Sequence, residues 1–159
     1  MLAAEYPKRR PDGRAGTYEY VSVDDAVRVV ALDDQQRLVL VEDDFHLQRR
    51  RVLHLPGGNC DGQEPREAAL RELEEETGLI AGDLRPLGVI DPLPSITSAR
   101  IFLFTATSLR TGRTRRDATE AGMTQHWRLL QDALAAVRNG EITEAGSVAA
   151  LLLSERAST

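Results

Sequence analysis

The strongest constraint on the fold is the segment at residues 65–79, PREAALRELEEETGL. Pro65 suits a first helical turn, because the N–H that proline lacks has no helical partner there. Aliphatic side chains then recur at a spacing of three and four residues, and Gly78 suits a left-handed helix end. The segment therefore predicts one short amphipathic helix.

The acidic residues of this helix are spaced so that they gather on one face. Glu72, Glu75 and Glu76 are three or four residues apart or adjacent, so they project together and repel one another by some tenths of a kcal/mol per pair. Mg²⁺ or Mn²⁺, which takes oxygen ligands, would turn this repulsion into binding. Arg71 could hold one carboxylate by a bidentate pair. A solvated acidic face is the alternative, and the Pro-Gly-Gly loop upstream favours the metal site.

The remaining pattern predicts mostly strands, then a helix, more strands and two further helices, which is an α+β order. A polar cluster at residues 33–36 separates the second and third strands and predicts a hairpin. Strands are expected at residues 18–23, 25–31, 37–41, 51–55, 87–90, 101–106 and 125–129, and helices at 131–138 and 143–154.

Length and composition predict a single domain with an ordinary buried core. The chain has 159 residues, of which 42% are apolar and 28% charged. Residues 1–16 are polar and rich in Arg, Pro and Gly, which predicts a flexible N-terminal tail before one domain at residues 17–159.

Charge and cysteine content bear on partners and compartment. A net charge of -5 argues against nonspecific binding of nucleic acid, and no apolar run is long enough to span a bilayer. We therefore expect neither a nucleic-acid nor a membrane partner. Cys60 is the single cysteine, so no intrachain disulfide is possible, and a cytoplasmic location is expected.

Residues 57–79 resemble the signature of the Nudix hydrolases, G-x5-E-x7-R-E-U-x-E-E-x-G-U, where U is a bulky aliphatic residue. The resemblance implies an α/β/α sandwich around a mixed β-sheet, and hydrolysis of a nucleoside diphosphate linked to another moiety. The second half of the signature matches at Arg71, Glu72, Leu73, Glu75, Glu76, Gly78 and Leu79.

The resemblance also implies roles for these residues. Glu72, Glu75 and Glu76, helped by the main-chain carbonyl of Gly57, would bind Mg²⁺ or Mn²⁺. Arg71 would orient a motif carboxylate, and Glu76 and Arg71 are thus both candidate catalytic residues. Bound cations would bridge the diphosphate and lower the pKa of a water that attacks phosphorus.

The first half of the signature aligns in two ways. Counting forward from Gly58 places the expected glutamate at Glu64, one residue too close to Arg71. Counting back from Arg71 keeps every spacing from Gly57, but places Gln63 where glutamate belongs. We favour a one-residue deletion, with Glu64 bridging to Arg71. Gln63 is the alternative, and it would hold an arginine less firmly because it carries no charge.

Over residues 18–153 the chain is most similar to the ADP-ribose pyrophosphatase branch. Pro94 lies near where those enzymes carry a distinguishing proline. The likeness implies ADP-ribose or another nucleotide sugar as substrate, with a nucleoside monophosphate and a sugar phosphate as products. Ala99, His54 and the acidic stretch at residues 42–45 depart from the branch and could shift its specificity.

The branch also implies a general base and substrate contacts. Glu120 is the candidate base, with Asp117 nearby, although an ordinary exposed loop acid is the alternative. Phe45 is a candidate for base contact. In a homodimer, Tyr20 or Tyr18 would reach the partner subunit and cover the adenine of the substrate. Alternatively, either residue could be an ordinary edge-strand residue with no role in binding. Pro94 would line the substrate site.

Two other functions stay open at this point. One is a nucleoside triphosphate pyrophosphatase that removes damaged nucleotides. The other is a non-catalytic sensor of a nucleotide ligand. A sensor tolerates substitution of its catalytic residues. The presence of all four signature residues argues against this function: Arg71, Glu72, Glu75 and Glu76.

Overall fold

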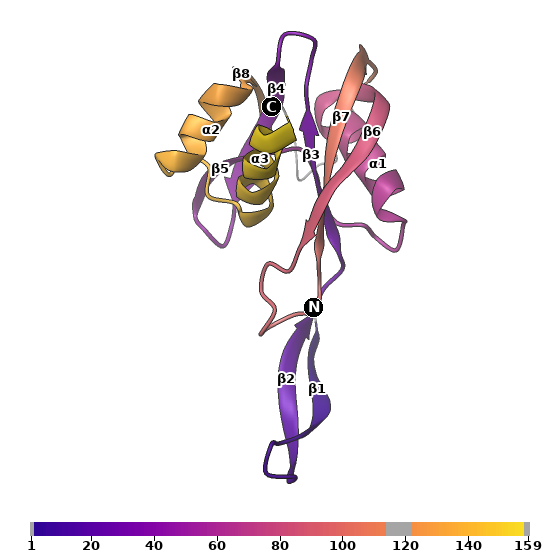
Figure 1. The fold of residues 1–159 in the computed structure, drawn as a ribbon, viewed down its shortest axis with the longest axis vertical. Coiled ribbons are helices and arrows are strands. Elements are labelled where there is room, and N and C mark those ends of the chain that lie inside the picture. The colour runs from indigo at the N-terminus through magenta and orange to yellow at the C-terminus, as the bar shows by residue number, and fades with distance from the viewer. Residues whose placement is uncertain (1, 114–121, 158–159) are drawn as a thin grey trace.

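Two three-stranded sheets form the centre of the fold in a computed structural model that describes residues 2–113 and 122–157 (Figure 1). In the first sheet, β7 pairs in parallel with β3 and antiparallel with β6; in the second, β4 pairs antiparallel with β5 and β8. The elements are β3 (Ala26–Ala31), β4 (Arg37–Phe45), β5 (Arg50–His54), α1 (Pro65–Thr77), β6 (Leu79–Ile90), β7 (Ile101–Thr111), β8 (Thr124–Leu129), α2 (Leu130–Arg138) and α3 (Ala145–Ala157).

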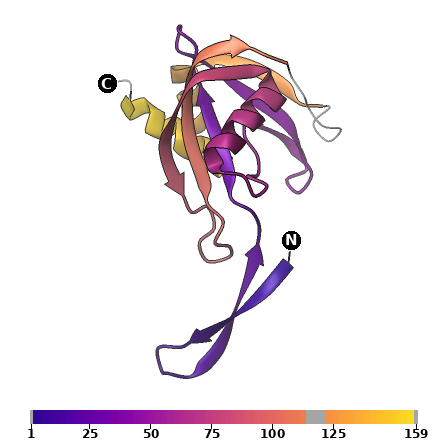
Figure 2. The ribbon, with the colours of Figure 1, turned by 90° about the vertical axis from the view of Figure 1, so that its right-hand side faces the viewer.

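The helices pack on opposite faces of the sheets and create two apolar cores. Val27 and Val29 of β3 pack with Leu73 of α1 in one core. Val30 of the same strand packs with Leu151 of α3 and with residues of α2 in the other. Since β3 is buried on both faces, its apolar residues run almost without interruption. Figure 2 shows α1 and α3 on different sides of the β3-β7-β6 sheet, which confirms the predicted α+β class with a mixed sheet.

The predicted hairpin of residues 25–41 is wrong. The turn itself forms, and Leu32 and Leu38 make one antiparallel bridge, but β3 and β4 then enter different sheets. The reason is that the free edge of β3 is already taken by the loop that precedes α1. The N–H of Val29 donates to Pro56 O, and that of Val27 donates to Gly58 O, each at 2.9 Å.

The first residues form a strand where a loose tail was expected. Strand β1 (Leu2–Arg9) pairs antiparallel with β2 (Ala15–Ser22), and the turn contains Gly13 at φ 80°. Figures 1 and 2 show this hairpin projecting from the body of the molecule. Strand β2 is mostly exposed, and among the described strands β1 and β2 pair only with each other.

The other elements form where they were expected, with different ends. Strand β6 begins at Leu79, directly after α1, and a register shift between Pro86 and Gly88 breaks the alternation on which strand prediction depends. None of the helices in the described part of the chain is long and apolar enough to cross a membrane.

Candidate active site

Helix α1 is formed and ended as its sequence predicts. Pro65 occupies its start, Glu64 stands before it in an extended conformation, and Gly78 ends it at φ 73° with its N–H donated to Glu74 O at 2.8 Å. The helix buries its small and aliphatic residues against the sheets. That packing also buries Glu72 and Glu76, whose exposed fractions are only 6% and 3%.

Two glycines bring the preceding loop into contact with these carboxylates. A Cβ on Gly57, which has φ 149°, would lie 2.0 Å from Val27 O. A Cβ on Gly58 would lie 2.7 Å from the carboxylate carbon of Glu72. The N–H of Gly57 donates to Glu76 Oε2 at 3.0 Å. Gly57 therefore has no room for a side chain against β3, and Gly58 has none against the acidic face of α1.

Arg71 joins the helix to the loop. Its Nη1 donates to Glu72 Oε1 at 2.7 Å and to Glu75 Oε2 at 3.2 Å. Its Nη2 donates to Asn59 O at 2.9 Å and lies 3.5 Å from Asp61 Oδ2. Burial opposes the charged form of Arg71, but ion pairing and hydrogen bonding with Glu72 and Glu75 raise the pKa of its guanidinium. Arg71 stays cationic and offsets the charge of two motif carboxylates.

The bridge predicted between Glu64 and Arg71 is absent, and the alternative alignment is the one that the geometry supports. Arg71 Nε donates to Gln63 Oε1 at 2.8 Å. Glu64 is exposed at the start of α1 and makes no side-chain capping hydrogen bond. The spacing from Gly57 is therefore complete, and a neutral amide occupies the position of the expected glutamate.

The oxygen atoms of this face suit a hard divalent cation in kind. Among the described residues, no three His, Cys, Asp or Glu side chains converge closely enough to hold a metal ion. Arg71 Nη1 contacts both Glu72 and Glu75, and the Gly57 N–H contacts Glu76. A cation that takes Glu72 and Glu75 competes with Arg71 Nη1 for these carboxylates.

Gln125 is a neighbour of α1 that sequence reasoning missed. Its Nε2 donates to Glu76 O at 3.1 Å and to Thr77 O at 3.2 Å, so it satisfies two carbonyls at the C-terminal end of the helix. It lies on β8 opposite Val41. Its position in a strand next to Trp127 gave no sign of this contact, which depends on how the two sheets meet.

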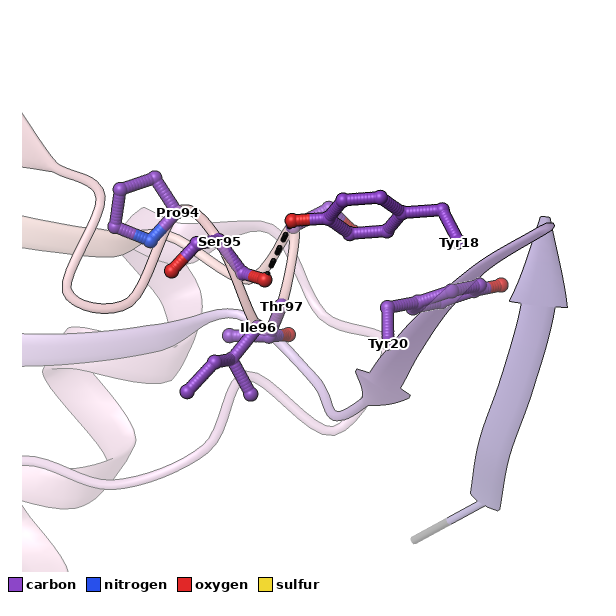
Figure 3. A pocket seen from close by; sticks show the side chains of 7 residues that line it. Tyr18, Tyr20, Pro94, Ser95, Ile96 and Thr97 are labelled. Carbon is purple, nitrogen blue, oxygen red and sulfur yellow. Dashed lines mark hydrogen bonds between the residues drawn. The ribbon is translucent and has the colours of Figure 1, made fainter. Parts of the chain in front are cut away.

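Two of the predicted substrate residues, Tyr20 and Pro94, lie at one pocket of about 320 Å³ (Figure 3). Tyr18 donates its hydroxyl to Ser95 O at 2.7 Å, and the N–H of Val21 donates to Ile96 O at 2.7 Å, so β2 is fastened to the loop between β6 and β7. The full lining is Tyr18, Tyr20, Pro94, Ser95, Ile96, Thr97 and Ser98.

The remaining predicted residues are not part of this pocket. Phe45 lies at the end of β4, where its ring centroid is 5.2 Å from that of His54. His54 is buried, its Nδ1 lies 2.8 Å from Leu55 O, and its Nε2 has no hydrogen-bond partner within residues 2–113 and 122–157. Glu120 and Asp117 lie outside the described residues.

The glycine loop and the acidic helix combine in the order that the signature requires. A NUDIX domain matches residues 23–148. The chain belongs to the NUDIX family. The resemblance seen in the motif is thus confirmed over most of the chain, and the chain is a Nudix hydrolase, a family whose members generally use divalent metal ions.

Known members of the family are similar to this chain along most of their length. An ADP-ribose pyrophosphatase from Mycobacterium tuberculosis is 35% identical over 147 residues, which cover 91% of this chain and 71% of the relative. An ADP-ribose pyrophosphatase from Bacillus subtilis is 30% identical over 143 residues, covering 89% and 77%. A solved structure described as an ADP compounds hydrolase superposes with a TM-score of 0.83 at 25% identity, covering 96% of this chain and 83% of that one. This confirms the Nudix sandwich fold.

Proposed function

We propose that this Nudix hydrolase cleaves the diphosphate bond of ADP-ribose or a closely related nucleotide sugar, giving AMP, or another nucleoside monophosphate, and a sugar phosphate. The observation that carries the proposal is the buried pair Glu72 and Glu76 on α1, packed against Gly57 and Gly58. Both relatives named above are ADP-ribose pyrophosphatases, which supports this substrate class.

We propose Mg²⁺ or Mn²⁺ as the cofactor, held by Glu72, Glu75 and Glu76 with the main-chain carbonyl of Gly57. A bound divalent cation offsets the charge of a diphosphate and lowers the pKa of bound water. The burial of Glu72 and Glu76 on one helix face supports this role, because neighbouring carboxylates repel each other and a hard divalent cation would turn that repulsion into binding. Before a cation binds, Arg71 orients Glu72 and Glu75 through its Nη1.

For the proton transfer we propose Glu120 as the general base. A general base needs to come within hydrogen-bond reach of the attacking water, directly or through one water. The proposal is supported by the place of Glu120 in the sequence, shortly before β8, whose Gln125 contacts the C-terminal end of α1.

For recognition of the nucleotide we propose that Tyr20 and Pro94 contact the base and that Phe45 contacts a separate part of the substrate. Tyrosine and proline side chains in an apolar hollow of about 320 Å³ suit a flat heterocycle. Phe45 lies at the end of β4, beside buried His54, and does not line that pocket.

We further propose a homodimer in which the β1–β2 hairpin meets a second copy of the chain. Both edges of a two-stranded ribbon expose N–H and C=O groups, and an isolated hairpin is marginally stable in water. The projection of this hairpin from the body supports the proposal (Figure 1). Light scattering measures the mass directly.

A coupled phosphatase assay tests the function. AMP and sugar phosphates are phosphomonoesters, so alkaline phosphatase releases inorganic phosphate from the products but not from intact ADP-ribose. The screen runs with Mg²⁺ and with Mn²⁺ over ADP-ribose, other nucleotide sugars and dinucleoside polyphosphates. Nucleoside triphosphates are assayed with inorganic pyrophosphatase in place of the phosphatase.

Each outcome of this screen separates the candidate functions. Phosphate release from ADP-ribose or a nucleotide sugar supports the proposal. Turnover confined to triphosphates would replace it with a nucleotide pyrophosphatase. Binding of ADP-ribose without turnover of any substrate would indicate a sensor.

A further inference from the structure

Arg71 lies between two sets of acceptors. The inner set, Glu72 and Glu75, belongs to α1 and receives hydrogen bonds from Nη1. The outer set belongs to the loop before the helix: Gln63 Oε1 is 2.8 Å from Nε, Asn59 O is 2.9 Å from Nη2, and Asp61 Oδ2 is 3.5 Å from Nη2. A planar guanidinium reaches both sets at once, because its N–H groups point in different directions.

Within the outer set, only one group carries charge. Gln63 offers a neutral amide and Asn59 a main-chain carbonyl, whereas Asp61 offers a carboxylate. Charge-assisted hydrogen bonds are shorter and about twice as strong as neutral ones. As long as Arg71 also contacts Glu72 and Glu75, the inner carboxylates compensate its charge. Once those carboxylates bind a cation, the loop must compensate it alone.

We propose that Asp61 is the residue that compensates Arg71 when a divalent cation takes Glu72 and Glu75. Asp61 thereby supplies the negative charge that Gln63 lacks, and it is a positioning residue that acts through Arg71. The inference rests on the proposed metal site. It adds Asp61, which is not a signature residue, to the residues on which binding of the cation depends.

The loop holds Asp61 in a conformation suited to this role. Asp61 has φ 51° and Gly62 has φ 76°, and the turn closes with the N–H of Gln63 donated to Cys60 O at 2.9 Å. Cys60 is buried and its N–H donates to Asp25 O at 2.8 Å, which fastens the turn to the body. The Asp61 side chain is 64% exposed, so it can move toward Arg71 without disturbing a core.

A Mn²⁺ titration of the full chain by calorimetry tests the proposal. Asp61→Asn removes the charge but keeps the backbone, since asparagine tolerates positive φ. We expect its Kd for Mn²⁺ to rise about three- to fivefold, the upper part of the range of an exposed ion pair. Adding Gln63→Glu to this variant restores the charge beside Arg71, and the Kd should return to within about twofold of the wild-type value.

The matched control is Asp83→Asn. Asp83 is also a partly exposed aspartate paired with an arginine, Arg85, at 2.6 Å, but it lies on β6. Its Kd for Mn²⁺ should equal the wild-type value. A loss of affinity in this control equal to that of Asp61→Asn would show a general charge effect and overturn the proposal.

A second measurement follows Arg71 itself by NMR. In Mg²⁺-saturated protein, the Nε–H of Arg71 should exchange with water faster in Asp61→Asn than in wild type, while the metal-free proteins should not differ. A Kd unchanged by Asp61→Asn, or not restored by Gln63→Glu, would overturn the role of Asp61. If Glu76→Gln also left Mn²⁺ binding unchanged, the proposed metal site itself would be wrong.

Discussion

Gly58 lies against the carboxylate of Glu72. We therefore predict that adding one methyl group at this position disturbs the proposed metal site. In Gly58→Ala, the new Cβ would stand 2.7 Å from the carboxylate carbon and push it out of position. We expect Mn²⁺ affinity to fall about 10- to 100-fold, as when the positioning of a ligand is lost. Gly122→Ala is the control, because a Cβ there meets nothing within 4 Å. Equal affinity of the two variants would contradict the packing described.

Glu120 gives a second prediction at the scale of a residue. If it is the base, Glu120→Gln lowers turnover about 100-fold or more, since general base catalysis contributes that much. The Kd for Mn²⁺ should stay near the wild-type value, because Glu120 is not among the proposed ligands. Turnover and calorimetry on the same sample separate the two effects. An unaffected rate removes Glu120 from the mechanism.

The helix half of the motif was predictable residue by residue, while the loop half was not. Helical spacing and the terminal signals at Pro65 and Gly78 depend on neighbouring residues, so the sequence shows them. The choice between Glu64 and Gln63 depends on a turn in which Asp61 and Gly62 both have positive φ. That turn directs Gln63 toward Arg71, and nothing in the spacing alone reveals it.

The start of α3 depends on a charged network that links it to β3. Arg28 Nε lies 3.1 Å from Glu144 Oε2, and both side chains are largely buried. Glu144 also accepts hydrogen bonds from the Ser147 N–H at 2.8 Å and the Ser147 hydroxyl at 2.7 Å. Burial alone would raise the pKa of Glu144, but Arg28 and Ser147 lower it to about 2. The carboxylate caps the helix and fastens it to the sheet.

This network predicts how stability depends on pH. A carboxyl whose pKa is lowered on folding stabilises the native state above its unfolded pKa, and this stabilisation is lost as pH falls toward the folded value. Glu144→Gln should therefore cost roughly 3 kcal/mol of unfolding free energy at pH 7 and less than half of that at pH 3. Urea denaturation at both pH values measures the difference. An equal cost at both would mean that charge is not responsible.

At the scale of elements, sequence patterns located the strands but not their partners. The single arginine in the apolar strand AVRVVA, Arg28, pairs with Glu144, a partner that only the fold identifies. The hairpin of β3 and β4 was predicted from a real turn. The prediction fails because strand pairing is non-local. The loop at Pro56 and Gly58 occupies the edge of β3 that a hairpin with β4 would need.

The whole molecule divides into a body and the projecting β1–β2 hairpin. Neither buried core includes a residue of β2, so the chain without residues 1–22 should still unfold cooperatively. The deletion removes Tyr18 and Tyr20 from the pocket. We therefore expect a KM for ADP-ribose raised about fivefold or more, because base stacking is worth about 1–3 kcal/mol.

Light scattering and kinetics on this truncated chain test both parts of the expectation. If the hairpin forms the proposed dimer, the mass per particle should fall by half as well. A truncated chain with the KM and the particle mass of the full chain would show that the hairpin takes part in neither recognition nor assembly.

The central claim is that α1 presents a metal-dependent catalytic face for hydrolysis of ADP-ribose, and one measurement tests it most directly. Formation of AMP from ADP-ribose is followed by chromatography in the presence of Mg²⁺, for wild type and for Glu76→Gln. We predict steady release of AMP by wild type and a rate at least about 100-fold lower for the variant. A variant with the wild-type rate, or a wild type that releases no AMP, would contradict the claim.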